Sequence, residues 1–334
     1  MGSELPKLLY ITSRGHSGST LTEMLIGAHS QVVPLGEIRQ LGTDREEPCR
    51  CGGGPLPGCG FWKAVEQRVQ AETGRTLHEL SLQDPDDAVF VADNRAFVAA
   101  CLAESGARWA IDSSKTLDRL QRLQDLGVFD LRVLHLTRSP FGVVHSNTKR
   151  GRPWLEHARN YTFAAMRERH FFAELGAEPP RADLRYERLV ARPEHELRRV
   201  MQLVELPFEP GQLDWATQDV HTFAGNPMRT TRDSTIRPDT SWRRGLSVRE
   251  IAGVAWWTLP IRFRGTRVFD EHRPYWKGDG VDAWKTFRQK RREKIRKARR
   301  LRWKKRPWIA GPYYTVKRGA RAIAALLRGR ASPP

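Results

Sequence analysis

Short apolar runs alternate with longer amphipathic segments over most of the first two hundred residues. The apolar runs have the length of buried strands, whereas the segments between them, the longest at 155–175, repeat apolar residues at helical spacing. Strands are predicted near 8–13, 31–35, 108–112, 131–137 and 182–186. This alternation predicts an α/β fold, in which helices flank a parallel sheet.

The charge of the chain is concentrated at one end. The net charge of the 334 residues is +19, and residues 285–334 hold 19 Lys and Arg against one acid, Glu293, which gives this segment +18. Residues 1–284 are therefore nearly neutral. We predict one α/β domain over 1–284, followed by a basic helical C-terminal tail over 285–334.

The tail has the pattern of a basic amphipathic helix. Val316, Ala320, Ile323 and Leu327 fall on one helical face, with Arg and Lys around it. An anionic membrane surface suits such a helix. Nucleic acid would attract the same charge and is the less favoured partner, and a solvated charged tail is the remaining alternative.

Two further patterns bear on the location of the protein. The longest apolar run, 251–261, is too short to span a bilayer. The N-terminus lacks the pattern of a signal peptide. We therefore expect a cytoplasmic protein, peripheral at the inner membrane face if the tail binds there.

The residues that follow the first predicted strand have the pattern of an anion-binding loop. Glycines expose consecutive backbone N–H groups, and a helix N-terminus adds more donors. Hydroxyls and two basic side chains supply the rest, in the run Ser13, Arg14, Gly15, His16, Ser17, Gly18, Ser19, Thr20. The loop of nucleotide triphosphatases requires a lysine where Gly18 stands. The alternative is an ordinary strand-to-helix turn rich in small residues.

A second anion site is predicted after the strand at 131–137. Arg138 stands at the carboxyl end of this strand, and Pro140 suits the first turn of a following helix. Ser146 then lies in the second turn, near the arginine. A guanidinium and a hydroxyl together suit a phosphate. The alternative is an arginine that caps the sheet and a serine that is merely helical.

Together the two motifs resemble the sulfotransferase family that uses 3'-phosphoadenosine 5'-phosphosulfate (PAPS), with its P-loop-like fold. The resemblance implies that the loop Arg14–Thr20 holds the 5'-phosphosulfate, and that Arg138 and Ser146 hold the 3'-phosphate. It extends from about Leu8 to Trp242 and is strongest to the bacterial branch, so the domain at 1–284 is expected to be the catalytic domain. Further matches in the expected order are Gly36-Glu37, 49–62, 111–115, 184–193, 225–229, and Asp239 with Trp242.

The resemblance also implies roles for single residues. Glu37 is the first candidate for the base that takes the proton of the acceptor, the alternative being a surface glutamate. His135 is a less favoured base, because it lies inside an apolar strand. Lys115 would touch the sulfuryl oxygens or an acidic acceptor, unless it is a surface lysine. Arg229 would meet the 3'-phosphate.

His16 departs from the family pattern, which often has Lys or Arg before Ser-Gly-Ser/Thr. Histidine has a reference pKa of about 6.5, so it is partly neutral at physiological pH. A neighbouring phosphosulfate would favour the imidazolium. His16 can then still act as a catalytic electrophile, with Arg14 as the permanent charge.

Three cysteines, Cys49, Cys51 and Cys59, lie close together in a segment rich in glycine. Structural zinc sites usually have four ligands, and the sequence offers no fourth ligand nearby. A disulfide would need an oxidising compartment. We therefore interpret the segment as an irregular loop and predict that no metal is required.

The sequence thus predicts an enzyme that moves a sulfuryl group from PAPS to a hydroxyl or amine of a carbohydrate or lipid-linked acceptor. The alternative is a catalytically silent nucleotide-fold protein, tethered to membrane or nucleic acid by its tail. A small-molecule kinase is disfavoured by the missing lysine of the loop. The acceptor itself and the oligomeric state are not predicted.

Overall fold

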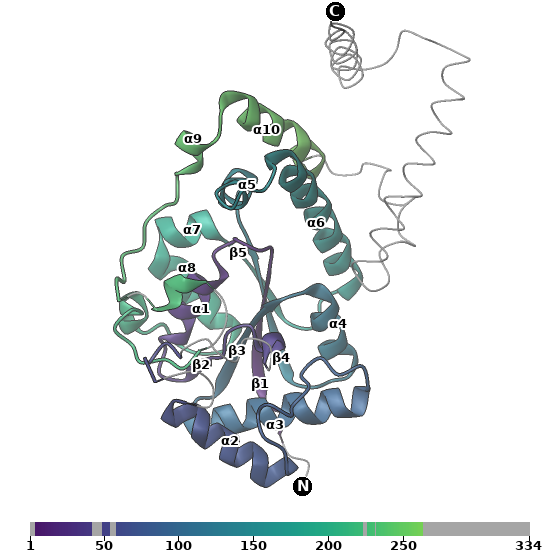
Figure 1. The fold of residues 1–334 in the computed structure, drawn as a ribbon, viewed down its shortest axis with the longest axis vertical. Helices are drawn as coiled ribbons and strands as arrows, with labels where there is room; N and C mark the ends of the chain where they lie inside the picture. The colour runs from purple at the N-terminus through teal and green to yellow at the C-terminus, as the bar shows by residue number, and fades with distance from the viewer. Residues whose placement is uncertain (1–3, 42–48, 54–57, 223–225, 231, 263–334) are drawn as a thin grey trace, which may run out of the picture. The chain divides into compact units, whose positions relative to one another are not determined.

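A computed structural model describes residues 4–41, 49–53, 58–222, 226–230 and 232–262. Five parallel strands form its centre, in the order β2-β3-β1-β4-β5 (Figure 1). They are β1 (Lys7–Ser13), β2 (Val32–Pro34), β3 (Trp109–Lys115), β4 (Asp130–Thr137) and β5 (Arg181–Arg185). Each predicted strand is present with its ends shifted by at most three residues, so the α/β prediction is confirmed.

The continuous apolar runs of the strands follow from burial on both faces of the sheet. Successive side chains of a strand point to opposite faces. Accordingly, Leu8 and Tyr10 of β1 pack in one core cluster, which includes the helices after β2. Leu9 and Ile11 pack in the other, which includes the helix after β1. A helical layer covers each face of the sheet.

Most of the helices follow a strand in the sequence and connect it to the next one. Pro140 occupies the first turn of its helix, as predicted, and the long predicted helix at 155–175 is present. The helices are α1 (Ser19–Gly27), α2 (Gly60–Thr73), α3 (Asp87–Ser105), α4 (Leu117–Asp125), α5 (Pro140–Thr148), α6 (Trp154–Leu175), α7 (Tyr186–Ala191), α8 (Pro193–Leu203), α9 (Trp242–Gly245) and α10 (Val248–Arg262), with short 3-10 turns η1 (Ile38–Gln40), η2 (Pro210–Asp214) and η3 (Pro227–Thr230).

Strand β3 is longer than its apolar run. It continues through the polar residues Asp112–Lys115, because Asp112 is fully buried and accepts from Arg119 Nε at 2.9 Å. A paired and hydrogen-bonded carboxylate tolerates burial that an isolated one does not. The extension carries Lys115 to the carboxyl edge of the sheet.

The topology marks where ligands bind. After β1 the chain crosses to β2 and returns through β3, and it then passes to β4 and β5 on the other side of β1. Ligands in open α/β sheets gather at such a switch point, beside the carboxyl ends of the strands. Here the two strands of the switch point are β1 and β4, which precede the loop at 14–18 and Arg138.

In the ranges that the structure describes, the longest helices are too polar or too short to cross a membrane. The predicted basic tail, 285–334, and its boundary at 284 lie outside the described residues. Both stay predictions from the sequence.

Candidate functional site

The loop between β1 and α1 has the backbone of an anion-binding turn. Gly18, the N-cap of α1, has φ +91°, and a side chain there would clash with the ring of Tyr186. His16 also has positive φ, at +66°. No side chain caps α1 within the described chain, so the N–H groups of its first turn remain available to a ligand.

The loop hydroxyls lie at the base of this turn. Ser17 and Ser19 are buried, and Thr20 Oγ1 accepts from the backbone N–H of Asn226 at 3.4 Å. This contact places the segment of η3 against the start of α1. The hydroxyl of Ser13, at the end of β1, is buried without a hydrogen-bond partner in the described part of the chain.

Arg14 is held by α6. Its guanidinium pairs with Glu168, and it lies 4.0 Å from the ring centroid of Tyr161. Both partners of the ion pair are largely buried. Arg14 would therefore have to leave Glu168 to reach a ligand, and its contact with the donor stays a prediction.

His16 is surrounded by cations. Its Nε2 lies 3.2 Å from Nη1 of Arg150. Burial, together with the charges of Arg150 and Lys115, lowers the pKa of His16 to about 4. The imidazole is thus neutral at pH 7, and the predicted imidazolium requires the negative charge of a bound ligand.

Arg138 links the two predicted anion sites. Its Nη1 donates to the backbone carbonyl of His16 at 2.8 Å, and its Nη2 donates to Asp239 at 2.6 Å. Its guanidinium also lies 4.4 Å from the ring centroid of Tyr186. The side chain that is predicted to hold the 3'-phosphate therefore contacts the loop that is predicted to hold the 5'-phosphosulfate.

Asp239 occupies a position that an anion would take. Burial acts to raise its pKa, but hydrogen bonds from Ser241 and Arg138 lower it to about 2, so the group is a carboxylate. The following Trp242 stacks on Phe141 of α5, with ring centroids 4.8 Å apart. The segment is thereby anchored to the helix that carries Ser146. Sequence reasoning matched Asp239 to the family but gave it no role.

Ser146 lies in α5 as predicted, and it is partly buried. In the described structure it makes no hydrogen bond to Arg138. The predicted pairing of the two side chains around one phosphate stays a prediction.

Glu37 and Lys115 form one buried pair. The carboxylate of Glu37 accepts from Lys115 Nζ, from Gln40 Nε2 at 2.7 Å and from Arg39 Nη2 at 3.3 Å. Glu37 is only 7% exposed, so the alternative of a surface glutamate is wrong. Lys115 is partly buried and has φ +72°. Nothing in the sequence indicated that these two candidates meet.

Arg229 is a buried residue of η3. Its Nη1 donates to the carbonyl of Thr222 at 3.3 Å, and its own carbonyl accepts from Arg50. The side chain thus supports the backbone of its own segment. Its predicted contact with the 3'-phosphate stays a prediction.

His135, the less favoured base, lies apart from Glu37 and Lys115. Its Nδ1 lies 2.8 Å from Asp183 and its Nε2 lies 3.5 Å from Glu168. These residues line a cavity of about 590 Å³ between β4, β5 and α6, whose lining includes Arg138 but neither Glu37 nor Lys115. His135 is therefore separated from the predicted acceptor side of the site.

Glu23 accepts a hydrogen bond from the residue before Glu37. It is fully buried in α1, where it accepts from the N–H of Gly36 at 2.6 Å and from Ser113 Oγ at 2.7 Å. Burial raises its pKa from 4.5 to about 7, against the opposing effect of these hydrogen bonds. The folded protein therefore keeps a proton on Glu23 that the unfolded chain loses.

This proton makes stability depend on pH. Between pH 4.5 and about 7 the folded state binds more protons at this site than the unfolded state. The free energy of unfolding therefore falls as pH rises, by about 3 kcal/mol over this range. Glu23→Gln keeps the shape without a titrating group. We expect urea unfolding of the variant to lose this part of the pH dependence. An unchanged slope would show that Glu23 is ionised in the folded protein.

The chain belongs to the sulfotransferase family, since the model of that family matches residues 9–210, more than half of the chain. Its members are enzymes that use PAPS. Among the solved structures that are similar to the chain are three sulfotransferases, and no curated protein matches the chain. The sulfotransferase domain of the curacin biosynthetic pathway shares 15% identity over 79% of this chain and 100% of its own, with a TM-score of 0.48.

The second similar structure is the sulfotransferase domain of the olefin synthase from Synechococcus PCC 7002. It shares 18% identity over 80% of this chain and 98% of its own, with a TM-score of 0.48. The third, sulfotransferase STF9 from Mycobacterium avium, shares 14% identity over 80% of this chain and 78% of its own, with a TM-score of 0.37. The predicted membership of the family is confirmed by the family match.

The residues present fit PAPS. PAPS carries a 5'-phosphosulfate and a 3'-phosphate on one ribose, and the carboxyl ends of β1 and β4 lead to two sets of hydrogen-bond donors. One is the uncapped N-terminus of α1 with the unpartnered Ser13 hydroxyl. The other is Arg138, which is buried beside it and tied to the carbonyl of His16.

Proposed function

We propose that this chain transfers the sulfuryl group of PAPS to a hydroxyl or amine of a carbohydrate or lipid-linked acceptor. The observation that carries the proposal is the hydrogen bond from Arg138 to the carbonyl of His16. It places the side chain that is predicted to hold the 3'-phosphate beside the loop that is predicted to hold the 5'-phosphosulfate.

The donor side is built from the loop and from β4. The backbone and hydroxyls of Gly15, Ser17, Gly18, Ser19 and Thr20 would hold the 5'-phosphosulfate. Arg138 and Ser146 would hold the 3'-phosphate, after the guanidinium exchanges the carboxylate of Asp239 for the phosphate. An exchange of one oxyanion for another keeps the guanidinium paired.

The acceptor side is built from Glu37, Lys115 and His16. Sulfuryl transfer resembles phosphoryl transfer, in which catalysis consists mainly of in-line positioning and charge stabilisation. Glu37 would take the proton of the acceptor, and Lys115, which it now binds, would turn to the sulfuryl oxygens. His16 would gain a proton as the ligand binds and would then offer a second positive charge.

The acceptor class is inferred from the basic tail. Its +18 charge would hold the enzyme at an anionic membrane, where lipid-linked acceptors lie. Each basic residue near the surface contributes about 1 kcal/mol of binding free energy. We infer a protein of the cytoplasm that is peripheral at the inner membrane face.

The competing function is a silent binding protein that keeps the fold without the chemistry. Radiolabelled PAPS, incubated with the protein and with lipid or glycan extracts, separates the two. We expect label in an acceptor, and about a hundredfold less when Glu37→Gln replaces the wild type. A protein that binds the desulfated product PAP and labels no extract would be the silent alternative.

The role of the tail is tested by deletion of 285–334. We expect PAP binding to survive, because all proposed donor contacts precede residue 230. Co-sedimentation with anionic vesicles should be lost, and in the full-length protein it should weaken at high salt. If the full-length protein ignores the vesicles but shifts DNA or RNA, the tail binds nucleic acid.

A further inference from the structure

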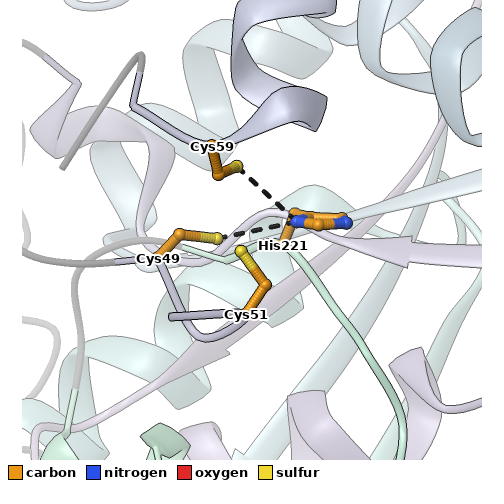
Figure 2. Close-up of side chains that lie close together, drawn as sticks. All are labelled: Cys49, Cys51, Cys59 and His221. Atoms are coloured by element: carbon orange, nitrogen blue, oxygen red, sulfur yellow. Dashed lines mark hydrogen bonds between the residues drawn. The ribbon is translucent and has the colours of Figure 1, made fainter. Parts of the chain in front are cut away.

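Three cysteines and a histidine meet beside the sheet (Figure 2). The three Sγ atoms of Cys49, Cys51 and Cys59 and one ring nitrogen of His221 all lie within 4.8 Å of one another. Nδ1 of His221 is 3.7 Å from Cys49 Sγ and 3.7 Å from Cys59 Sγ. Sequence reasoning missed this histidine, which stands 162 residues after Cys59.

We propose that these four side chains bind one zinc ion in a structural Cys3His site. Tetrahedral zinc with Zn–S of about 2.3 Å and Zn–N of about 2.0 Å requires S···N separations of about 3.5 Å and S···S separations of about 3.8 Å. The S···N separations of Cys49 and Cys59 from His221, 3.7 Å each, are close to this value, and the remaining separations are at most 4.8 Å. The chain itself supplies all four ligands, as in structural zinc sites, which leave no open position for a substrate.

The backbone around the cysteines is shaped to hold this cluster. Gly52 has φ +84°, and its N–H donates to the carbonyl of Cys49 at 3.0 Å, which closes the turn between the first two ligands. A Cβ at Gly53 would lie 2.7 Å from that of Cys59. Only glycine at this position allows the backbone after Cys51 to lie this close to Cys59.

The ligands also have the outer contacts that metal sites use for orientation. The N–H of Gly53 donates to Cys51 Sγ at 3.4 Å, and the N–H of Trp62 donates to Cys59 Sγ at 3.5 Å. The ring of His221 stacks on Phe61, with centroids 4.6 Å apart and planes 6° apart. Such N–H···S bonds would stabilise thiolates, and the stacking fixes the direction of the imidazole.

The site joins two segments that are distant in the sequence. The cysteines lie between η1 and the start of α2, whereas His221 precedes η3. Arg50, between two of the cysteines, is buried and donates to the carbonyls of Trp215 at 3.2 Å, Ala216 at 2.9 Å and Arg229. The zinc would therefore hold in place the segment that carries Arg229 and touches Thr20 of the phosphate loop.

The direct test is the metal content of the full-length protein, purified without chelator and measured by mass spectrometry. We expect about one zinc ion per chain. Cys59→Ala should lower this content at least tenfold. Cys101→Ala, the same change at a buried cysteine of α3 outside the cluster, should leave it unchanged.

A rescue separates ligation from folding. His221→Ala should lose the zinc, whereas His221→Cys supplies a fourth thiolate and should retain it. Cobalt added to the metal-free protein should give the visible absorption of tetrahedral thiolate coordination. A wild-type protein that holds no metal and takes up neither zinc nor cobalt overturns the proposal. So does a disulfide between two of the three cysteines in freshly purified protein.

A second consequence rests on the proposed function. Removal of zinc by a chelator should weaken PAP binding, because the Arg229 segment loses its anchor, and added zinc should restore it. If the protein loses its zinc and PAP binding is unchanged, the four side chains still form a zinc site. Only the proposed effect of the zinc on PAP binding is then wrong. Failure of PAP to bind any form would count against the proposed function instead.

Discussion

Glu37→Gln is expected to lower turnover by about a hundredfold or more, while PAP affinity stays near that of the wild type. The amide keeps the shape of the side chain and its contacts to Gln40 and Arg39, but it cannot take a proton from the acceptor. Since the buried carboxylate is bound by Lys115 before any substrate arrives, it is already placed at the carboxyl edge of β3. Turnover and PAP affinity, measured on the same preparations, give the two readouts.

Glu196→Gln is the matched control for this variant. Glu196 is also buried and ion-paired, but its partner is Arg199 on α8, away from the site. We expect this change to alter turnover little. If Glu37→Gln keeps full activity, another group takes the proton of the acceptor.

Arg138→Ala should weaken the binding of PAP by roughly 1.5–3 kcal/mol, the worth of a hydrogen bond to a charged group. This corresponds to about a 10- to 150-fold loss of affinity. Adenosine 5'-phosphate lacks the 3'-phosphate, so the variant should lose much less affinity for this ligand. Because Arg138 also holds the carbonyl of His16, a small loss for both ligands is expected from the loop itself, and the ratio of the two affinities is the informative quantity.

Arg198→Ala controls for the change in total charge. Arg198 is exposed on α8 and pairs with Glu194, so its loss should leave both affinities unchanged. Equal losses for PAP and adenosine 5'-phosphate in Arg138→Ala would make Arg138 a support of the loop and remove it from the 3'-phosphate site.

The strands could be predicted because the sheet is covered on both sides, so its strands are nearly continuous apolar runs. The loop could be predicted because glycines and hydroxyls follow the first strand without a gap. Glu37 and Lys115 were each selected, but their pairing was not, since they stand 78 residues apart and meet only through the order of β2 and β3. Local sequence carries no information about such a meeting.

The same reason explains the two largest differences from the sequence interpretation. The sequence near the three cysteines contains no fourth ligand, whereas the fold brings His221, which follows β5 in the chain, to them. The sequence predicts Arg14 as the permanent charge of the loop, but its ion-pair partner Glu168 comes from α6, about four turns into a helix whose polar residues do not indicate contact with the loop. Both partners are set by the tertiary fold.

The most direct measurement is a calorimetric titration of the full-length protein with PAP and, separately, with ATP and magnesium. The account predicts that PAP binds about tenfold or more tightly than ATP, because only PAP places a phosphate at both Arg138 and the loop at 14–20. Arg138→Ala should remove most of this preference. ATP that binds as tightly as PAP, or more tightly, would contradict a site built for the two phosphate ends of PAPS.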